Sequence, residues 1–396
     1  MTNGISVRLA ALLAALSLLL GGCWDRKEIN DVAFVLGSAV DKEGELYRAT
    51  IQIALPGKLG GQQGGGGGGG TSGTKPWYTA SKTAETIREA NLKEQQDISR
   101  TLNFSHRRTL VIGEALAKEG IEPIMDVMGR IPQNRLTALV LVSRGPSGKV
   151  LSTEVPYDQF PAEALREMAS SAFRVPRTMK IVINLMLMDG IDVALPAVSL
   201  GQTSTMEGGE TADTIQIDGL ALFSHNKLAG FLSGSEAEGV LWAMGQIRSP
   251  EIVVKAPEGE GKIIARFFES ETEVHPSVRG GEVRYRIDIR ARGTIIENQS
   301  TFQLNDHDHL ERLEDQLEKK IREDVEAGLK RMVDMRSDAV GLGKTLHSAN
   351  PRAWRRLKNG WHDRLASLRF VVDPTVDIEN IGSVVKPLGR REEHLR

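Results

Sequence analysis

Apolar and polar positions recur along this chain with two different periods, and the shorter period predicts β-strands. A continuous apolar run at 33–40 and an alternating run at 46–55 flank the turn-forming sequence Asp41-Lys42-Glu43-Gly44 and so predict a hairpin. A second hairpin is predicted around the turn Ser224-His225-Asn226-Lys227. The remaining predicted strands lie near 77–79, at 109–113 and 136–143, at 263–273 with 283–296, and in a last pair at 370–372 and 376–378.

The longer period, of three to four residues, predicts helices between these strands. The clearest one covers 308–333, where apolar residues recur from Leu310 to Met332 and Asp308 followed by Glu311 predicts a capping box. Others are expected at 81–96, 121–128, 162–171 and 353–365. Runs of strands followed by helices are typical of an α+β fold, so we expect mixed and antiparallel sheets packed with helices in more than one domain.

The polar segment 202–213 is the predicted domain boundary. An N-terminal α/β region is expected at 24–201, and whether it divides into two subdomains stays open. It contains a Gly-rich loop at 60–74, which has too few side chains to pack. A C-terminal domain with antiparallel strands and the long helix is expected at 214–388.

The first 22 residues predict export. The only charged residue among them is Arg8, and the apolar run at 9–20 is shorter than the roughly twenty residues that span a bilayer. Leu20-Gly21-Gly22-Cys23 resembles the lipobox of bacterial lipoproteins, and Cys23 is the only cysteine of the chain. We therefore predict a lipoprotein signal peptide at 1–22 and a diacylglyceryl anchor on Cys23. The alternative is an ordinary cleaved signal followed by a chance cysteine.

Composition excludes several classes of protein. With 396 residues, 40% hydrophobic, the chain is not a wholly disordered one. Its net charge of −2 lacks the basic excess of a typical nucleic-acid-binding protein. A single cysteine cannot form an intrachain disulfide or a cysteine-based metal site.

The sequence contains only partial matches to known catalytic, phosphate-binding or metal-binding motifs. Gly341-Leu342-Gly343-Lys344-Thr345 resembles part of a P-loop, but Asp338 stands where that motif needs glycine, and a helix is expected where it needs a strand. His307, Asp308 and His309 are better explained as a helix start than as metal ligands. No metal or cofactor is therefore predicted, and paired acids such as Asp213 and Asp218 do not by themselves support catalysis.

Residues 344–369 are rich in lysine and arginine and contain two tryptophans. Two arrangements are open for this segment: a tryptophan-bearing basic helix that contacts a membrane or an acidic partner, or core packing of both tryptophans with arginines outside. We favour the second for the tryptophans. The candidate contact residues are Trp354, Arg355, Arg356, Lys358 and Trp361.

Four segments together resemble one known family. They are residues 23–37, beginning Cys23-Trp24-Asp25; residues 104–121, with Phe104-Ser105-His106; residues 218–242, with Asp218-Gly219-Leu220; and residues 337–361, with Pro351, Trp354 and Trp361. In this order they are similar to the Ger(x)C spore germination lipoproteins, the C subunits of GerA-type nutrient germinant receptors.

The resemblance implies a non-enzymatic, lipid-anchored subunit on the outer face of the spore inner membrane. Its implied partners are a polytopic A subunit and a transporter-like B subunit. An alternative is the lipid-anchored solute-binding protein of an importer, which needs two similar lobes of repeated strand–helix–strand units. A lipid-anchored cell-wall hydrolase is a third, weakened by the lack of a catalytic motif.

Overall fold

The structure is a computed structural model that describes residues 31–55, 75–204, 211–304 and 306–381. The strands are β1 (Val32–Glu43), β2 (Leu46–Ala54), β3 (Trp77–Ala84), β4 (Thr101–Asn103), β5 (Thr109–Gly113), β6 (Leu139–Ser143), β7 (Ala194–Ser204), β8 (Thr211–Ser224), β9 (Lys227–Leu232), β10 (Glu251–Lys255), β11 (Lys262–Arg279), β12 (Glu282–Asn298) and β13 (Arg369–Asn380). The helices are α2 (Ile87–Gln96), α3 (Glu114–Glu119), α4 (Glu122–Arg130), α5 (Ser147–Ser152), α6 (Pro161–Ala172), α7 (Met179–Met186), α8 (Gly234–Ala243), α9 (His307–Asp334), α10 (Leu342–Ala349), α11 (Pro351–Leu357) and α12 (Trp361–Arg364), followed by the 3-10 turn η3 (Leu365–Ser367).

The first sheet has the strand order β3-β2-β1-β5-β6-β7-β8-β9, and β4 pairs with β1 outside this path. Its central strands β1, β5, β6 and β7 are parallel, and the outer ones are antiparallel. β5 and β6 are buried along their whole length, because helices cover both faces of the sheet. Leu110 and Ile112 pack against α3, α4 and α7, while Val111 between them packs against α5 and α6.

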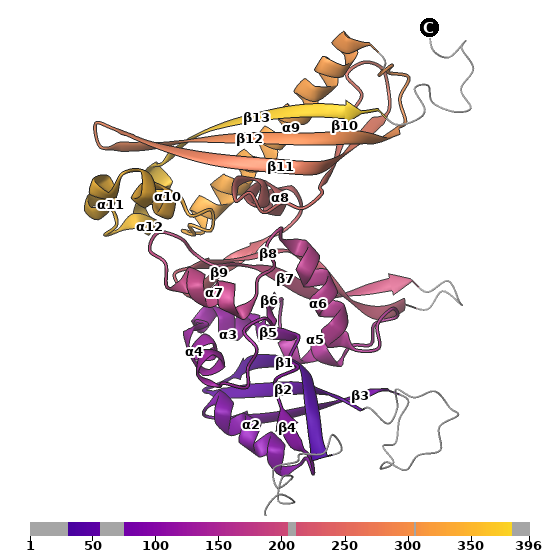
Figure 1. Ribbon diagram of the computed structural model, residues 1–396, viewed down its shortest axis with the longest axis vertical. Helices are drawn as coiled ribbons and strands as arrows, with labels where there is room; N and C mark the ends of the chain where they lie inside the picture. Colours follow the sequence, from indigo (N-terminus) through magenta and orange to yellow (C-terminus); the bar gives the residue numbers. More distant parts are fainter. Residues whose placement is uncertain (1–30, 56–74, 205–210, 305, 382–396) are drawn as a thin grey trace, which may run out of the picture.

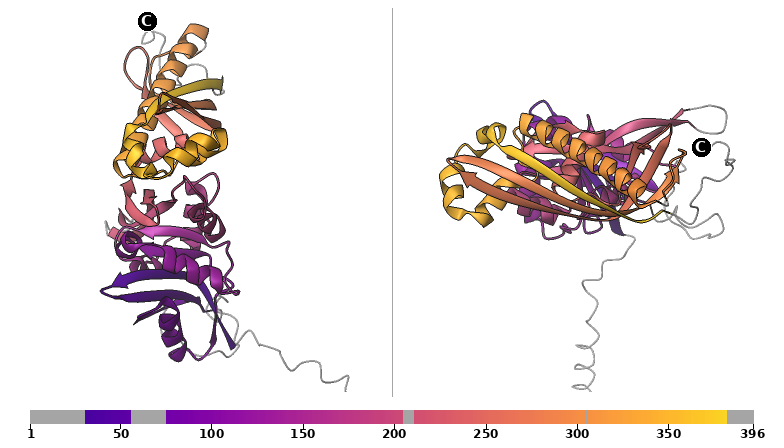
Figure 2. Two further views of the ribbon diagram at one scale, coloured as in Figure 1. Left: turned by 90° about the vertical axis from the view of Figure 1, so that its left-hand side faces the viewer. Right: turned by 90° about the horizontal axis from the view of Figure 1, so that it is seen from above.

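The second sheet has the order β10-β11-β12-β13, and its last strand runs parallel to β12. Along β12, Val283, Tyr285 and Ile287 are buried, whereas Arg284 and Arg286 between them are exposed. Helices α8 and α9 cover the buried face, and α9 runs along it in both views of Figure 2. The sheet therefore has one dry face and one wet face.

The two sheets lie one above the other along the long axis of the molecule, with α8 between them (Figure 1). One apolar core joins them: Leu220 and Leu222 of β8 belong to the same cluster as Trp242 of α8 and Phe267 of β11. We call the part of the molecule built on the first sheet the first region, and the part built on the second sheet, with α8–α12, the second region. The two regions are therefore packed against each other rather than only linked.

Helix α9 also protects the free edge of the second sheet. On β13, the amides of Val376 and Ile378 donate to Glu318 Oε1 (3.0 Å) and Glu314 Oε1 (2.8 Å). Arg322 Nε donates to the carbonyl of Val372 (3.1 Å). Side chains spaced four residues apart on the helix thus take the place of a neighbouring strand, which disfavours edge-to-edge association.

The α+β class and the three hairpins agree with the sequence analysis, but several boundaries were wrong. The helix expected at 81–96 begins only at Ile87, because 77–84 pair with β2 and Thr86 caps the helix by accepting from the amide of Glu89. The long helix is capped by Asp306 rather than Asp308, so the expected capping box is not the one used.

Two elements near the C-terminus also differ from expectation. The helix expected at 353–365 is broken into α11 and α12, because Gly360 adopts a left-handed conformation with φ of 76°. The predicted strand pair at 370–378 is a single strand, β13; its Pro374 is tolerated because β13 is an edge strand.

Both described ends of the polar segment 202–213 are paired strand residues. Gln202 pairs with Asp213 and Thr203 with Ala212, so β7 and β8 continue into a long hairpin within the first sheet. The hairpin β8–β9, which we assigned to the C-terminal domain, likewise hydrogen-bonds with the first sheet. The division of the chain into domains at 24–201 and 214–388 stays a prediction. The signal peptide 1–22, Cys23, the whole Gly-rich loop 60–74 and residues 382–388 lie outside the described residues.

Candidate functional site

A buried carboxylate pair joins the two regions of the molecule. Asp338, in the turn after α9, accepts from the amides of Leu342 (Oδ1, 2.7 Å) and Gly343 (Oδ2, 2.8 Å). The indole Nε1 of Trp361 donates to the same Oδ2 at 2.7 Å. Asp338 therefore organises the start of α10 and holds α12 against it.

Asp192, in the segment before β7, is the partner of Asp338 from the first region. The amide of Asp338 donates to Asp192 Oδ2 (2.7 Å), and the amide of Asp192 donates to the Asp338 carbonyl (2.9 Å). His362 Nε2 lies 2.8 Å from Asp192 Oδ2, and the amide of His225, in the β8–β9 turn, donates to Oδ1 (2.9 Å). The His225 and His362 rings stack with centroids 3.9 Å apart. One buried carboxylate thus connects four segments of the chain.

We call this network of Asp192, His225, Asp338, Trp361 and His362 the junction. The pKa shifts of its side chains follow from burial and from their hydrogen bonds. Desolvation raises the pKa of Asp338 to about 6, although the hydrogen bonds that its carboxylate accepts act to lower this pKa. The hydrogen bond with Asp192 raises the pKa of His362 above its ordinary value. The contact with Asp192 therefore stabilises the protonated form of His362.

A cleft of about 320 Å³ opens beside this network. One wall is formed by Asp189 and Gly190 ahead of β7, and the opposite wall by Trp354, Lys358 and Trp361. The backbone is very close at its base, since a Cβ on Gly190 would lie 2.5 Å from the carbonyl carbon of Gly343. The Trp354 ring lies against Gly343, and the amides of Leu342, Gly343 and Lys344 already donate to Asp338 or to the carbonyl of Gly190. The P-loop-like sequence therefore does not offer these amides to a phosphate.

The structure separates the predicted contact residues into two groups. Trp354 and Trp361 are each 3% exposed and pack edge to face at 5.2 Å, which is the arrangement favoured for them from sequence. They lie on two separate helices, α11 and α12, and not on one tryptophan-bearing helix. They support the fold and are not surface contacts.

Arg355, Arg356 and Lys358 are exposed, and together with other cations of α10–α12 they form what we call the basic surface. Its members are Lys344, Arg352, Arg355, Arg356, Lys358 and Arg364. None of the six makes an ion pair within the described part of the chain, and the nearby Asp363 pairs with Arg336 (3.3 Å). The basic surface is thus a concentration of positive charge that the fold itself does not neutralise.

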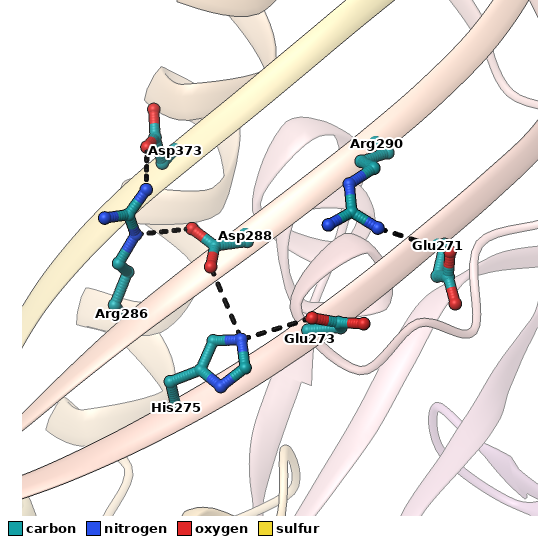
Figure 3. Close-up of polar contacts among 7 residues, drawn as sticks. All are labelled: Glu271, Glu273, His275, Arg286, Asp288, Arg290 and Asp373. Carbon is teal, nitrogen blue, oxygen red and sulfur yellow. Dashed lines mark hydrogen bonds and ion pairs between the residues drawn. The ribbon is translucent and has the colours of Figure 1, made fainter.

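The wet face of the second sheet carries charge of both signs (Figure 3). Arg286 of β12 bridges Asp288 Oδ1 and Asp373 Oδ2 at 2.6 Å each. His275 of β11 lies 3.2 Å from Glu273 and 3.4 Å from Asp288. In contrast to the basic surface, these charges are paired with each other across the strands.

The histidines at the start of α9 do not converge on a common site. His309 Nδ1 lies 2.9 Å from the carbonyl of Gln303 and its ring stacks on Phe302, whereas His307 lies 3.3 Å from Glu311. Among the described residues, no group of three His, Cys, Asp or Glu side chains could hold a metal ion.

Sequence reasoning missed Asp192, His225 and His362. They lie 33 or more residues apart in the chain and meet only because the first sheet packs against α10–α12. The one signal in the sequence was the predicted turn at 224–227, which contains His225; in the structure this residue has a φ of 56°.

Two family models match the chain in order. The model described as "Spore germination protein N-terminal domain" matches residues 25–200, and that described as "Spore germination B3/ GerAC like, C-terminal" matches residues 218–382. No described helix has the length and apolar character needed to cross a membrane.

Individual relatives agree with the family models. The protein YfkR of Bacillus subtilis (strain 168) is 39% identical over 371 residues, covering 94% of this chain and 96% of that protein. Spore germination protein KC of the same organism is 26% identical, covering 89% of this chain and 90% of that protein. The crystal structure of the GerBC protein superposes with a TM-score of 0.53 at 20% identity, covering 87% of this chain and 97% of that one, which supports the fold.

Proposed function

The chain belongs to the GerAC-like family of spore germination proteins, and we propose that it is a non-enzymatic subunit of a nutrient germinant receptor. Its role would be in germinant sensing and the triggering of germination, together with a polytopic A subunit and a transporter-like B subunit. The observation that carries the proposal is that both family models match in order and together cover nearly all of the chain after Cys23. An importer's solute-binding protein is less favoured, because the described sheets differ in strand number and topology and do not form two similar lobes.

The proposed anchor is a diacylglyceryl group on Cys23, which places the protein on the outer face of the spore inner membrane. The support is the lipobox-like sequence at 20–23 and the absence of any other cysteine in the sequence. Two or three acyl chains bury enough methylene groups for stable attachment, whereas one chain is marginal.

The basic surface is the proposed contact with a membrane-associated partner. Arg355 and Arg356 are exposed on α11, and Lys358 is exposed just after it. The buried side chains of Trp354 and Trp361 fix α11 and α12 to the core. Unpaired cations attract an acidic partner, and no ion pair within the fold has to be broken before they bind it.

Co-purification tests the receptor role. A tagged chain and its Cys23→Ala variant are isolated side by side from detergent-solubilised spore inner membranes. We expect the wild-type chain to bring down two polytopic membrane proteins, and the variant to be released from the membrane or left unprocessed. Recovery of an ATPase-coupled permease, or of no partner, would contradict the receptor role. A processed variant that still fractionates with membranes would contradict the lipid anchor.

Charge reversal tests the contact surface. Arg355, Arg356 and Lys358 are changed together to Glu, and the matched control changes Arg88, Lys149 and Lys180, three exposed cations of the first region, to Glu. We expect the first triple variant to recover at most a tenth as much partner as the control, at equal amounts of folded protein. Equal recovery from both would show that the basic surface is not the contact.

A further inference from the structure

A second pocket lies in the first region, away from the junction. It has a volume of about 290 Å³ and is formed by the loops that enter β5 and β6 together with α6. The side chains that line it include His106, Arg107, Arg108, Arg135, Thr137 and Arg166, and none of its lining residues is acidic. This is a cavity with cations on several sides.

The walls of this pocket are held by the first sheet. The amide of Arg108 donates to the carbonyl of Leu36 (2.6 Å), and the amide of Leu139 donates to the carbonyl of Arg108 (2.9 Å). The His106 ring packs edge-on against Phe34 with centroids 5.0 Å apart. Because these contacts fix the backbone of both loops, the cationic side chains are directed from a rigid frame.

The positive charge of the pocket is only partly compensated. Arg108 and Arg166 share Glu163, at 3.7 Å and 2.7 Å, and Arg166 also contacts Glu167. Arg135 and His106 have no ion pair within the described residues, and the hydroxyl of Thr137 has no hydrogen bond there. The pocket thus contains donors without acceptors.

Arg107 adds a buried cation with neutral partners. It is 4% exposed, and its Nη1 donates to Asn134 Oδ1 (3.1 Å) and contacts Met128 Sδ (2.7 Å), while its guanidinium lies over the Phe104 ring. Its Nε has no partner in the described structure. A buried guanidinium with neutral partners is costly unless an anion lies nearby.

Glu94 is the acid whose charge would act on Arg107, but it does not neutralise the guanidinium at neutral pH. Glu94 of α2 is fully buried, and desolvation raises the pKa of its carboxyl to about 8. Burial lowers the pKa of Arg107 only to about 10, so the guanidinium stays protonated while Glu94 is mostly neutral. The region around the pocket therefore has a net positive charge.

We propose that this pocket binds a small molecule through an oxyanion group, a carboxylate or a phosphate. Guanidinium forks of Arg108, Arg135 and Arg166 match the geometry of such a group, and the Thr137 hydroxyl supplies a further donor. Binding would balance the charge that Glu163 leaves uncompensated. The site is separate from the basic surface and does not depend on the receptor role.

Isothermal titration of the purified full-length protein in detergent tests this proposal. The probes are inorganic phosphate and succinate at pH 7, with ionic strength held constant by sodium chloride. We expect saturable binding of at least one probe, and at least a fivefold loss of affinity in Arg135→Gln, whose exposed side chain makes no ion pair in the described fold. Arg88→Gln, an exposed arginine of α2 outside the pocket, is the control and should bind as wild type does.

The outcomes distinguish the ligand chemistry. Binding of phosphate alone supports a phosphoryl ligand, and binding of succinate alone supports a carboxylate. Failure of both probes to saturate, or equal affinities of Arg135→Gln and Arg88→Gln, would overturn the site. A ligand-induced rise in melting temperature that Arg135→Gln loses and Arg88→Gln keeps would give independent support.

Discussion

The two sheets of this protein differ in how many of their faces are covered. In the first, helices lie on both faces, and the central strands β5 and β6 are entirely buried. In the second, α8 and α9 cover one face and the other carries paired charges (Figure 3). Both faces of the first sheet therefore contribute to an apolar core, whereas the second sheet presents one broad polar face. The basic surface lies on the helices α10–α12 that follow this sheet's long helix. Exposed and unpaired positive charge therefore gathers at one end of the second region, where we propose the contact with a partner.

The junction connects these unlike regions, and Asp338→Ala tests how strongly. The change leaves the amides of Leu342 and Gly343 and the indole of Trp361 without their buried acceptor. We expect the free energy of unfolding to fall by about 3–4 kcal/mol, measured by urea unfolding.

The matched control for the junction is Asp363→Ala. This carboxylate is exposed, and its one ion pair among the described residues is with exposed Arg336, so its loss should change the free energy of unfolding by less than about 1 kcal/mol. If the two variants were equally stable, the carboxylate pair would not be what holds the regions together.

The second region depends on one close helix crossing. Gly239 of α8 faces α9 so closely that an added Cβ would lie 1.9 Å from the carbonyl oxygen of Asp324. Gly239→Ala must therefore push the helices apart, and we expect a loss of about 2–3 kcal/mol in urea unfolding. Gly129→Ala in α4 is the control: its nearest neighbour would be 3.7 Å away, and removing a helical glycine should stabilise by about 0.5–1 kcal/mol. Equal stability of the two variants would refute the close crossing.

The first region contains a buried acid, Glu94, that should make the stability of the protein depend on pH. Glu94 has a pKa of about 8 when folded, against 4.5 ordinarily, so the folded state holds its proton more tightly. Its contribution to stability is full below about pH 4.5 and declines as the pH rises through 8. Glu94→Gln should remove this decline, so its free energy of unfolding relative to wild type should rise by about 4 kcal/mol between pH 5 and pH 9.

Unfolding curves at the two pH values measure this effect. Glu85→Gln, which changes an exposed acid just before α2, should keep the pH dependence of wild type. An unchanged pH dependence in Glu94→Gln would mean that Glu94 is ionised in the folded protein.

The smallest effect is expected on the wet face of the second sheet. Arg286→Ala removes two ion pairs, but its side chain is 59% exposed, so the loss should stay below about 1 kcal/mol and vanish at high salt. Its neighbour Ile287 points to the buried face, and Ile287→Ala should lose about 2–5 kcal/mol. Similar losses from both would show that the outer face is not a solvent-facing one.

Local pattern predicted much of the fold because it reports on burial. The alternation along β12 and the periodicity of α9 come from one face being dry, and both elements were located from sequence. The breaks at Lys358–Gly360 and at Ile87 were missed, because they depend on a left-handed glycine and on pairing with a distant strand. The exposure of Arg355, Arg356 and Lys358 followed from the basic composition of that segment.

The sequence by itself determined the family, the α+β class and the positions of the main strands and helices. These are properties of neighbouring residues or of ordered motifs. Tertiary structure alone decided that Asp192 meets Asp338 and His362, and that four arginines surround one pocket. The physical reason is that charge compensation and desolvation depend on distances in space, which residues far apart in the chain acquire only when the sheets and helices pack.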